Sequence, residues 1–168
     1  GTAMSSVKVH SHGGAGDHPR IALLLGDAYR AMGDADRARG QYERAVDIAK
    51  KGGGLFPDAR VALARLLRDQ KNVPQALAAL DQAITEYGQG SPGGAAAAYV
   101  EMAETERSRG AKPEVLFPLF VKALEKDPAR CEALWGAGKL GYDAAKGLDE
   151  SSQPRLERYV QLCPRAAN

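Results

Sequence analysis

The two cysteines are the residues with the most distinctive chemistry in this sequence. Cys131 and Cys163 both lie in the C-terminal quarter of the chain. They are nearly equidistant in sequence from Gly147, so if the chain turns there between two antiparallel helices, the cysteines lie at the open end of that hairpin and their side chains should be neighbours. A disulfide there would join the ends of the hairpin and indicate an oxidising compartment, such as the periplasm or cell envelope. The alternative is two separate, partly buried thiols in a cytoplasmic protein, and the sequence leaves the compartment unknown.

The other polar residues form no recognisable catalytic or metal-binding set. The histidines, His10, His12 and His18, are all near the start of the chain, and His-x-His in a glycine-rich segment is typical of a tail. The sequence contains no nucleophile elbow and no phosphate-binding loop. We therefore predict no enzyme activity, no metal site and no cofactor.

Charge and hydropathy exclude two further classes of partner. The net charge of +2 is distributed along the chain, whereas nucleic-acid binding is associated with a concentrated basic patch. No apolar run approaches the roughly 18 residues that a membrane-spanning helix requires. We therefore predict neither nucleic-acid binding nor direct membrane insertion.

A recurring pattern of small and large residues must position these side chains. It is clearest in residues 22–45, ALLLGDAYRAMGDADRARGQYERA. Small residues let two helices cross closely, and large residues fill the space around the crossing. The pattern resembles the tetratricopeptide repeat (TPR), in which W-x2-L-G-x2-Y is followed by A-x3-F and a closing Pro. The matching residues are Leu25, Gly26, Tyr29, Ala38, Tyr42 and Ala45, while Ala22 and Lys50 occupy the Trp and Pro positions.

The same frame recurs in three further segments with less regular spacing. We predict hairpins at about residues 18–51, 57–88, 92–127 and 129–163, with spacings of about 38, 39 and 35 residues, compared with about 34 in the family pattern. Residues 18–164 would form the TPR domain, residues 1–17 a flexible tail that begins with a cloning remnant, and residues 165–168 a C-terminal tail. The resemblance implies an all-α solenoid of about four TPR-like helix-turn-helix hairpins, wound into a right-handed superhelix.

The resemblance also implies which side chains line the concave groove formed by the first helix of each hairpin. Arg30, Arg68 and Arg107 occupy the same groove position in three successive repeats, with Arg65 and Lys139 about one turn away. Because the arginine guanidinium binds carboxylates through paired hydrogen bonds, this row would suit an acidic partner segment.

The alternative is that these arginines are neutralised within their own helices and only form a solvated surface. Asp27 would then pair with Arg30, and Glu104 with Arg107, at a spacing of three residues. Arg68 has no such intrahelical partner in the sequence.

The only tryptophan, Trp135, occupies a groove position of the last repeat, and Tyr142 follows two turns later. Exposed aromatic side chains in a groove would anchor a side chain of a partner. The alternative is that Trp135 packs beneath the second helix of the third or fourth hairpin.

Together these patterns predict a non-catalytic scaffold that binds a segment of another protein or peptide along the groove. Two alternatives remain open: a structural role through end-to-end stacking of repeats, with self-association, or a role that resembles the TPR lipoproteins of bacterial cell-envelope (pilus or secretion) assembly. The candidate groove residues are Asp27, Arg30, Arg65, Arg68, Glu104, Arg107, Trp135, Lys139 and Tyr142.

Overall fold

The computed structural model describes residues 18–163, which contain eight helices and no strand. The predicted tails, residues 1–17 and 165–168, lie outside these residues. No helix in the described part of the chain is long and apolar enough to cross a membrane. The helices are α1 Pro19–Ala31, α2 Ala35–Lys51, α3 Pro57–Asp69, α4 Val73–Tyr87, α5 Pro92–Ser108, α6 Pro113–Lys126, α7 Cys131–Ala145 and α8 Gln153–Leu162.

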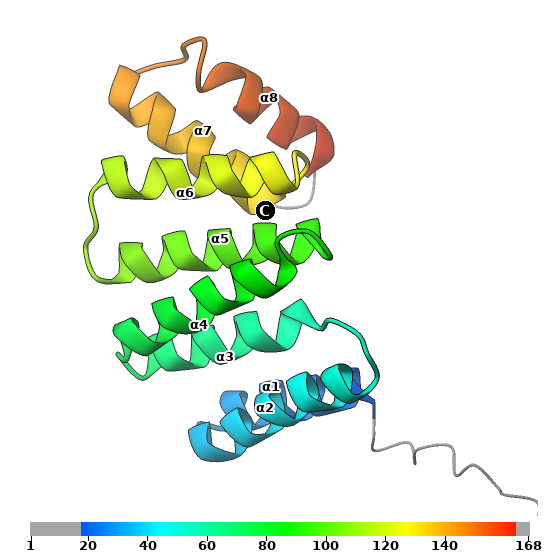
Figure 1. The fold of residues 1–168 in the computed structure, drawn as a ribbon. Coiled ribbons are helices and arrows are strands. Elements are labelled where there is room, and N and C mark those ends of the chain that lie inside the picture. The colour runs from blue at the N-terminus through cyan, green and yellow to red at the C-terminus, as the bar shows by residue number, and fades with distance from the viewer. Residues whose placement is uncertain (1–17, 164–168) are drawn as a thin grey trace, which may run out of the picture.

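The helices form four hairpins that stack in chain order (Figure 1). Within the hairpins, α1 packs on α2, α3 on α4, α5 on α6 and α7 on α8. Between hairpins, the second helix of one packs on the first helix of the next, and α3 also packs directly on α5. Each hairpin therefore buries apolar side chains both between its own two helices and against its neighbours, which is the packing of a solenoid. The predicted all-α solenoid of helical hairpins is confirmed.

Close helix crossings depend on residues without large side chains, as the pattern predicts. Gly26 of α1 faces the fully buried ring of Tyr42 in α2, and a Cβ atom at Gly26 would lie 2.4 Å from that ring. Gly136 of α7 faces Phe120 of α6 in the same way, with a corresponding distance of 2.6 Å. These crossings set how closely successive helices approach.

The turn inside each hairpin contains one residue in the left-handed conformation. Gly33 has a φ of 77° and Gly110 a φ of 84°, while Lys71 and Lys146 have φ values of 64° and 54°. A left-handed residue ends a helix because it lets the following backbone N–H groups reach the last carbonyls. Glycine adopts this conformation without the steric cost that lysine incurs.

Candidate functional site

An open pocket of about 650 Å³ lies between α3, α5, α7 and α8, within the size range typical of ligand sites. Five predicted groove residues line it, whereas Asp27, Arg30, Lys139 and Tyr142 do not. The lining residues are Arg65, Arg68, Val100, Glu101, Glu104, Arg107, Ser108, Cys131, Glu132, Trp135, Gly136 and Tyr159. The pocket therefore spans the first helices of the second, third and fourth hairpins.

Glu101 is a buried carboxylate in this pocket, with only 4% of its surface exposed. Nε and Nη2 of Arg65 both donate to Glu101 Oε2, at 3.1 and 2.9 Å. Arg68 forms an ion pair with the other carboxylate oxygen. Because α3 carries both arginines and α5 carries the glutamate, this group of three charges joins the second hairpin to the third.

Arg107 forms the intrahelical pair given above as the alternative to a free row of arginines. Its Nη1 donates to Glu104 Oε1 at 2.6 Å, and its guanidinium carbon lies 5.4 Å from the centre of the Phe120 ring. A guanidinium over an aromatic face gains a cation–π interaction. Arg107 is thus held on two sides while part of its side chain remains exposed.

The first hairpin differs from the predicted intrahelical pairing. Arg30 donates from Nε to Asp69 of α3 at 3.0 Å, and this hydrogen bond raises the pKa of the guanidinium above its ordinary value. Asp27 instead accepts a hydrogen bond of 2.8 Å from the hydroxyl of Tyr42. The predicted Asp27–Arg30 pair is therefore wrong, because Asp27 points to the second helix of its own hairpin and Arg30 to the next hairpin.

Each arginine in the predicted row thus has a carboxylate partner within the protein. Arg30 binds Asp69, the last residue of α3, and Arg68 binds Glu101 of α5, so each partner belongs to the first helix of the following hairpin. Arg107 binds Glu104 on its own helix. Glu101 is a buried pocket residue that the repeat pattern does not indicate. The available signal was a charge of opposite sign one repeat length further along the chain, since Arg65 and Glu101 are 36 residues apart.

The aromatic end of the pocket is formed by Trp135 of α7 and Tyr159 of α8. Their ring centres lie 5.4 Å apart, and Trp135 remains 49% exposed. Trp135 therefore both contacts the second helix of its hairpin and faces the pocket.

Tyr142 is exposed outside the pocket, and Lys139 pairs with Asp143 on the same helix. Tyr159 also lines the pocket, which the pattern of a single repeat does not indicate.

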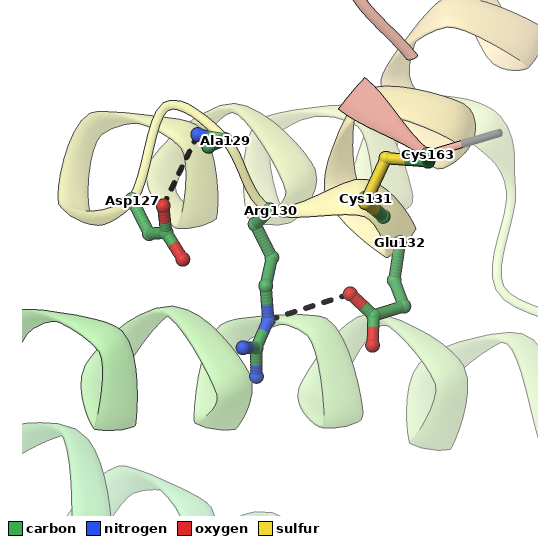
Figure 2. Close-up of a disulfide and its surroundings, with 6 residues drawn as sticks. All are labelled: Asp127, Ala129, Arg130, Cys131, Glu132 and Cys163. Carbon is green, nitrogen blue, oxygen red and sulfur yellow. Dashed lines mark hydrogen bonds and ion pairs between the residues drawn. A yellow bond between two sulfur atoms is a disulfide. The ribbon is translucent and has the colours of Figure 1, made fainter. Parts of the chain in front are cut away.

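A disulfide lies beside this aromatic pair. It joins Cys131, where α7 begins, to Cys163, which follows α8, with their Cα atoms 6.0 Å apart (Figure 2). One turn further along α7, Trp135 meets Tyr159, and one turn beyond that Gly138 faces Leu156. Each step along α7 is matched by a similar step back along α8, as two antiparallel helices in register require.

The helix α8 depends strongly on these contacts because none of its own residues is buried. Its start is held by Asp149, which accepts hydrogen bonds from the backbone N–H groups of Ser151 and Ser152 and from the Ser152 hydroxyl. These hydrogen bonds lower the pKa of Asp149 below its ordinary value. Its end is held by the disulfide.

The charges of the pocket cancel. Three arginines, Arg65, Arg68 and Arg107, face three glutamates, Glu101, Glu104 and Glu132. Glu132 is the most exposed of these glutamates, and its ion pair with Arg130 has a separation of 3.5 Å (Figure 2). Within residues 18–163, no cluster of His, Cys, Asp or Glu side chains is arranged to hold a metal ion.

The sequence matches the family model described as tetratricopeptide repeat over residues 10–54, 23–91 and 51–111. No curated protein is similar to it in sequence. Among solved structures, it is similar to YrrB, described as a TPR protein with an unusual peptide-binding site. The identity is 18% and the TM-score 0.52, covering 90% of this chain and 72% of YrrB.

Two further solved structures have the same arrangement of hairpins. TTC0263, a thermophilic TPR protein in Thermus thermophilus, is 22% identical with a TM-score of 0.56, covering 87% of this chain and 75% of its own. MamA is 18% identical with a TM-score of 0.58, covering 91% of this chain and 82% of its own. At these identities the likeness establishes the fold alone.

Proposed function

Because the chain belongs to the tetratricopeptide repeat family, whose members bind other proteins or peptides, we propose that it is a non-catalytic scaffold for a segment of a partner protein. The proposed binding surface is the pocket between α3, α5, α7 and α8. The observation that carries the proposal is the half-exposed Trp135, held against Tyr159 at one end of this pocket. Large aromatic side chains in a concave site are the residues that most often dominate binding energy.

The candidate groove residues outside the pocket, Asp27, Arg30, Lys139 and Tyr142, would belong to an extension of the same binding surface. An acidic partner would suit the arginines of the row only if its carboxylates could share them with Glu101 and Glu104, because these glutamates already bind them.

A capture experiment with matched variants tests this function. The immobilised domain, a Trp135→Ala variant and a Met32→Ala control would be exposed to lysate of the source organism. Met32 is exposed at the far end of the solenoid, so its replacement should change nothing. We expect a partner to be retained by the domain and by the control but lost from Trp135→Ala, with circular dichroism showing all three equally folded. A partner retained equally by all three proteins would exclude the pocket as the binding surface.

End-to-end stacking is the second candidate function, and exposed apolar residues at both ends of the solenoid favour it. Ile21 and Leu24 of α1 are exposed at one end, and Val160 and Leu162 of α8 at the other. Contact between such unlike ends is heterologous and would build closed rings or open chains, depending on the rotation between copies. Sedimentation velocity over a wide concentration range tests this role: growth in size that Leu24→Glu abolishes would support it, and a constant monomer would exclude it.

We also propose an oxidising compartment, such as the periplasm or cell envelope, on the basis of the Cys131–Cys163 disulfide. This location is compatible with a role in cell-envelope assembly. Titration of thiols in denaturant, on protein isolated from its natural source with thiols blocked at lysis, tests the location. Two reactive thiols per chain would place the protein in a reducing compartment.

A further inference from the structure

We propose that the pocket binds an extended, nearly uncharged peptide segment of a partner through one large apolar side chain, preferably aromatic, that packs on Trp135 and Tyr159. The proposal rests on the proposed scaffold function and specifies the chemistry of its partner. It differs from the acidic segment that the row of arginines predicts from the sequence.

The apolar part of the pocket provides the anchor site. Trp135 of α7 and Tyr159 of α8 form one wall, and Cys131, whose sulfur is bonded to Cys163, lies one turn from Trp135. Val100 of α5 contributes an aliphatic side chain to the same cavity. An aromatic side chain of the partner would remove the exposed half of Trp135 from water and gain ring–ring contact.

The charged part of the pocket opposes an acidic ligand. Glu101 and Glu104 are covalently part of the chain and already bind the arginines that a partner carboxylate would need. A tethered group acts at a high effective concentration, so an incoming carboxylate competes poorly with it. The exposed carboxylate of Glu132 would in addition repel an acidic side chain placed near Trp135.

The hydrogen-bonding groups that remain open suit a peptide backbone. Arg65 uses Nε and Nη2 to bind Glu101 and leaves the N–H groups of Nη1 for a ligand, with 42% of its side chain exposed. Glu104 and Glu132 each keep one carboxylate oxygen without a partner in the described structure. An extended segment offers a carbonyl acceptor and an N–H donor at each residue, so it can bind both kinds of group without any net charge.

Selection from a random peptide library tests the proposal even though the partner is unidentified. The oxidised domain would be panned against a displayed library of about twelve-residue peptides, a length that spans this pocket when extended. Enriched sequences without Trp would then be synthesised and titrated against the domain. Trp135 is the only tryptophan, so its fluorescence reports binding at this pocket directly.

We expect the enriched peptides to share one aromatic or large aliphatic residue and to have a mean net charge near zero. Trp135→Ala should weaken their binding at least about tenfold, the effect of removing an interface anchor, and Trp135→Phe should restore part of it. For these variants, which lack the fluorescent reporter, calorimetry supplies the affinity. Val160→Ala is the matched control, because Val160 adjoins Tyr159 in sequence but lines a separate cavity, and it should leave the affinity unchanged.

Two outcomes would overturn this inference but leave the scaffold function standing: enrichment of acid-rich peptides whose binding depends on Arg65 or Arg107, or peptides whose binding is unaffected by Trp135→Ala. A dimer that Trp135→Ala dissociates would identify a second copy as the occupant and also overturn it. If no peptide is enriched over the starting library, both the inference and the pocket as a peptide site are wrong.

Discussion

Loss of the Cys131–Cys163 disulfide should unfold the fourth hairpin before the rest of the solenoid. The bond closes a loop with a sequence separation of 32 residues, for which the chain-entropy relation gives a contribution of about 3.7 kcal/mol at 25 °C. Since α8 buries none of its own residues, its remaining contacts are partly exposed to solvent and should compensate for only part of that loss. In a solenoid, a terminal unit can open while the units beyond its neighbour stay folded. Reduction should therefore lower the stability of this hairpin by several kcal/mol and leave the first three hairpins largely intact.

Urea denaturation followed by two probes would measure this local opening. Trp135 fluorescence reports the surroundings of the fourth hairpin, because Trp135 is the single tryptophan and packs on Tyr159 one turn from the disulfide. Far-ultraviolet circular dichroism reports all the helices together. In the oxidised protein we expect the two transitions to be closer together, and with a reductant the fluorescence transition should move to lower urea, ahead of the loss of helix.

A Cys131→Ser and Cys163→Ser double variant is the matched control. It should behave like the reduced protein and be insensitive to the reductant, which separates loss of the bond from other effects of the reagent. A difference of less than about 0.5 kcal/mol between the reduced and oxidised proteins, in the free energy of unfolding obtained from Trp135 fluorescence, would refute a large role for the disulfide. The aromatic contact and the Asp149 cap would then be sufficient to hold α8.

Three further predictions concern packing, buried charge and pH. Gly26→Ala should lower the free energy of unfolding by about 1 to 3 kcal/mol through the clash with Tyr42, whereas Gly40→Ala, on an open helix surface, should raise it by about 0.5 to 1 kcal/mol; equal effects in urea denaturation would contradict the close-contact argument. Glu101→Gln should lower the free energy of unfolding by about 1 to 3 kcal/mol, less than the loss from breaking a fully buried ion pair, because Arg65 is partly exposed. Glu132→Gln, at the pocket edge, should lower it by less than about 0.5 kcal/mol. Thermal and urea unfolding measure both changes. Burial and the hydrogen bond to a carboxylate raise the pKa of Tyr42 above its ordinary value, so the folded chain keeps a proton that the unfolded chain releases above about pH 10. Its contribution to stability should be constant below that pH and fall above it, and an alkaline loss of stability that Tyr42→Phe does not reduce would assign the effect to other groups.

The sequence predicts the helical framework because the framework is determined locally. Gly26 and Tyr42 lie on the two helices of one hairpin, which are joined by a single turn. Their spacing in sequence is therefore enough to identify a close crossing. Gly33 and Gly110 likewise mark the ends of helices through their own backbone preference. Each of these features depends only on residues within one hairpin, which is the unit that the repeat pattern describes.

The ion pairs are harder to predict because they depend on the offset between stacked hairpins. Glu104 and Arg107 lie on one helix, so their contact follows from helical periodicity and the prediction is confirmed. Arg30 and Asp69 belong to different hairpins, and their contact requires the rotation and height of one relative to the other. The pattern of a single repeat does not contain this geometry, which is also why it does not indicate that Tyr159 reaches the pocket.

The charge contacts between hairpins also restrict how this protein can evolve or be redesigned. Repeat proteins commonly gain and lose whole units, because each unit meets similar neighbours. Here, inserting a unit between the second and third hairpins would separate Arg65 and Arg68 from Glu101 and leave a carboxylate buried without its counter-ions. Units could be added beyond either end of the solenoid without that penalty, so lengthening of this chain should have occurred at its ends and not at the junction that forms the pocket.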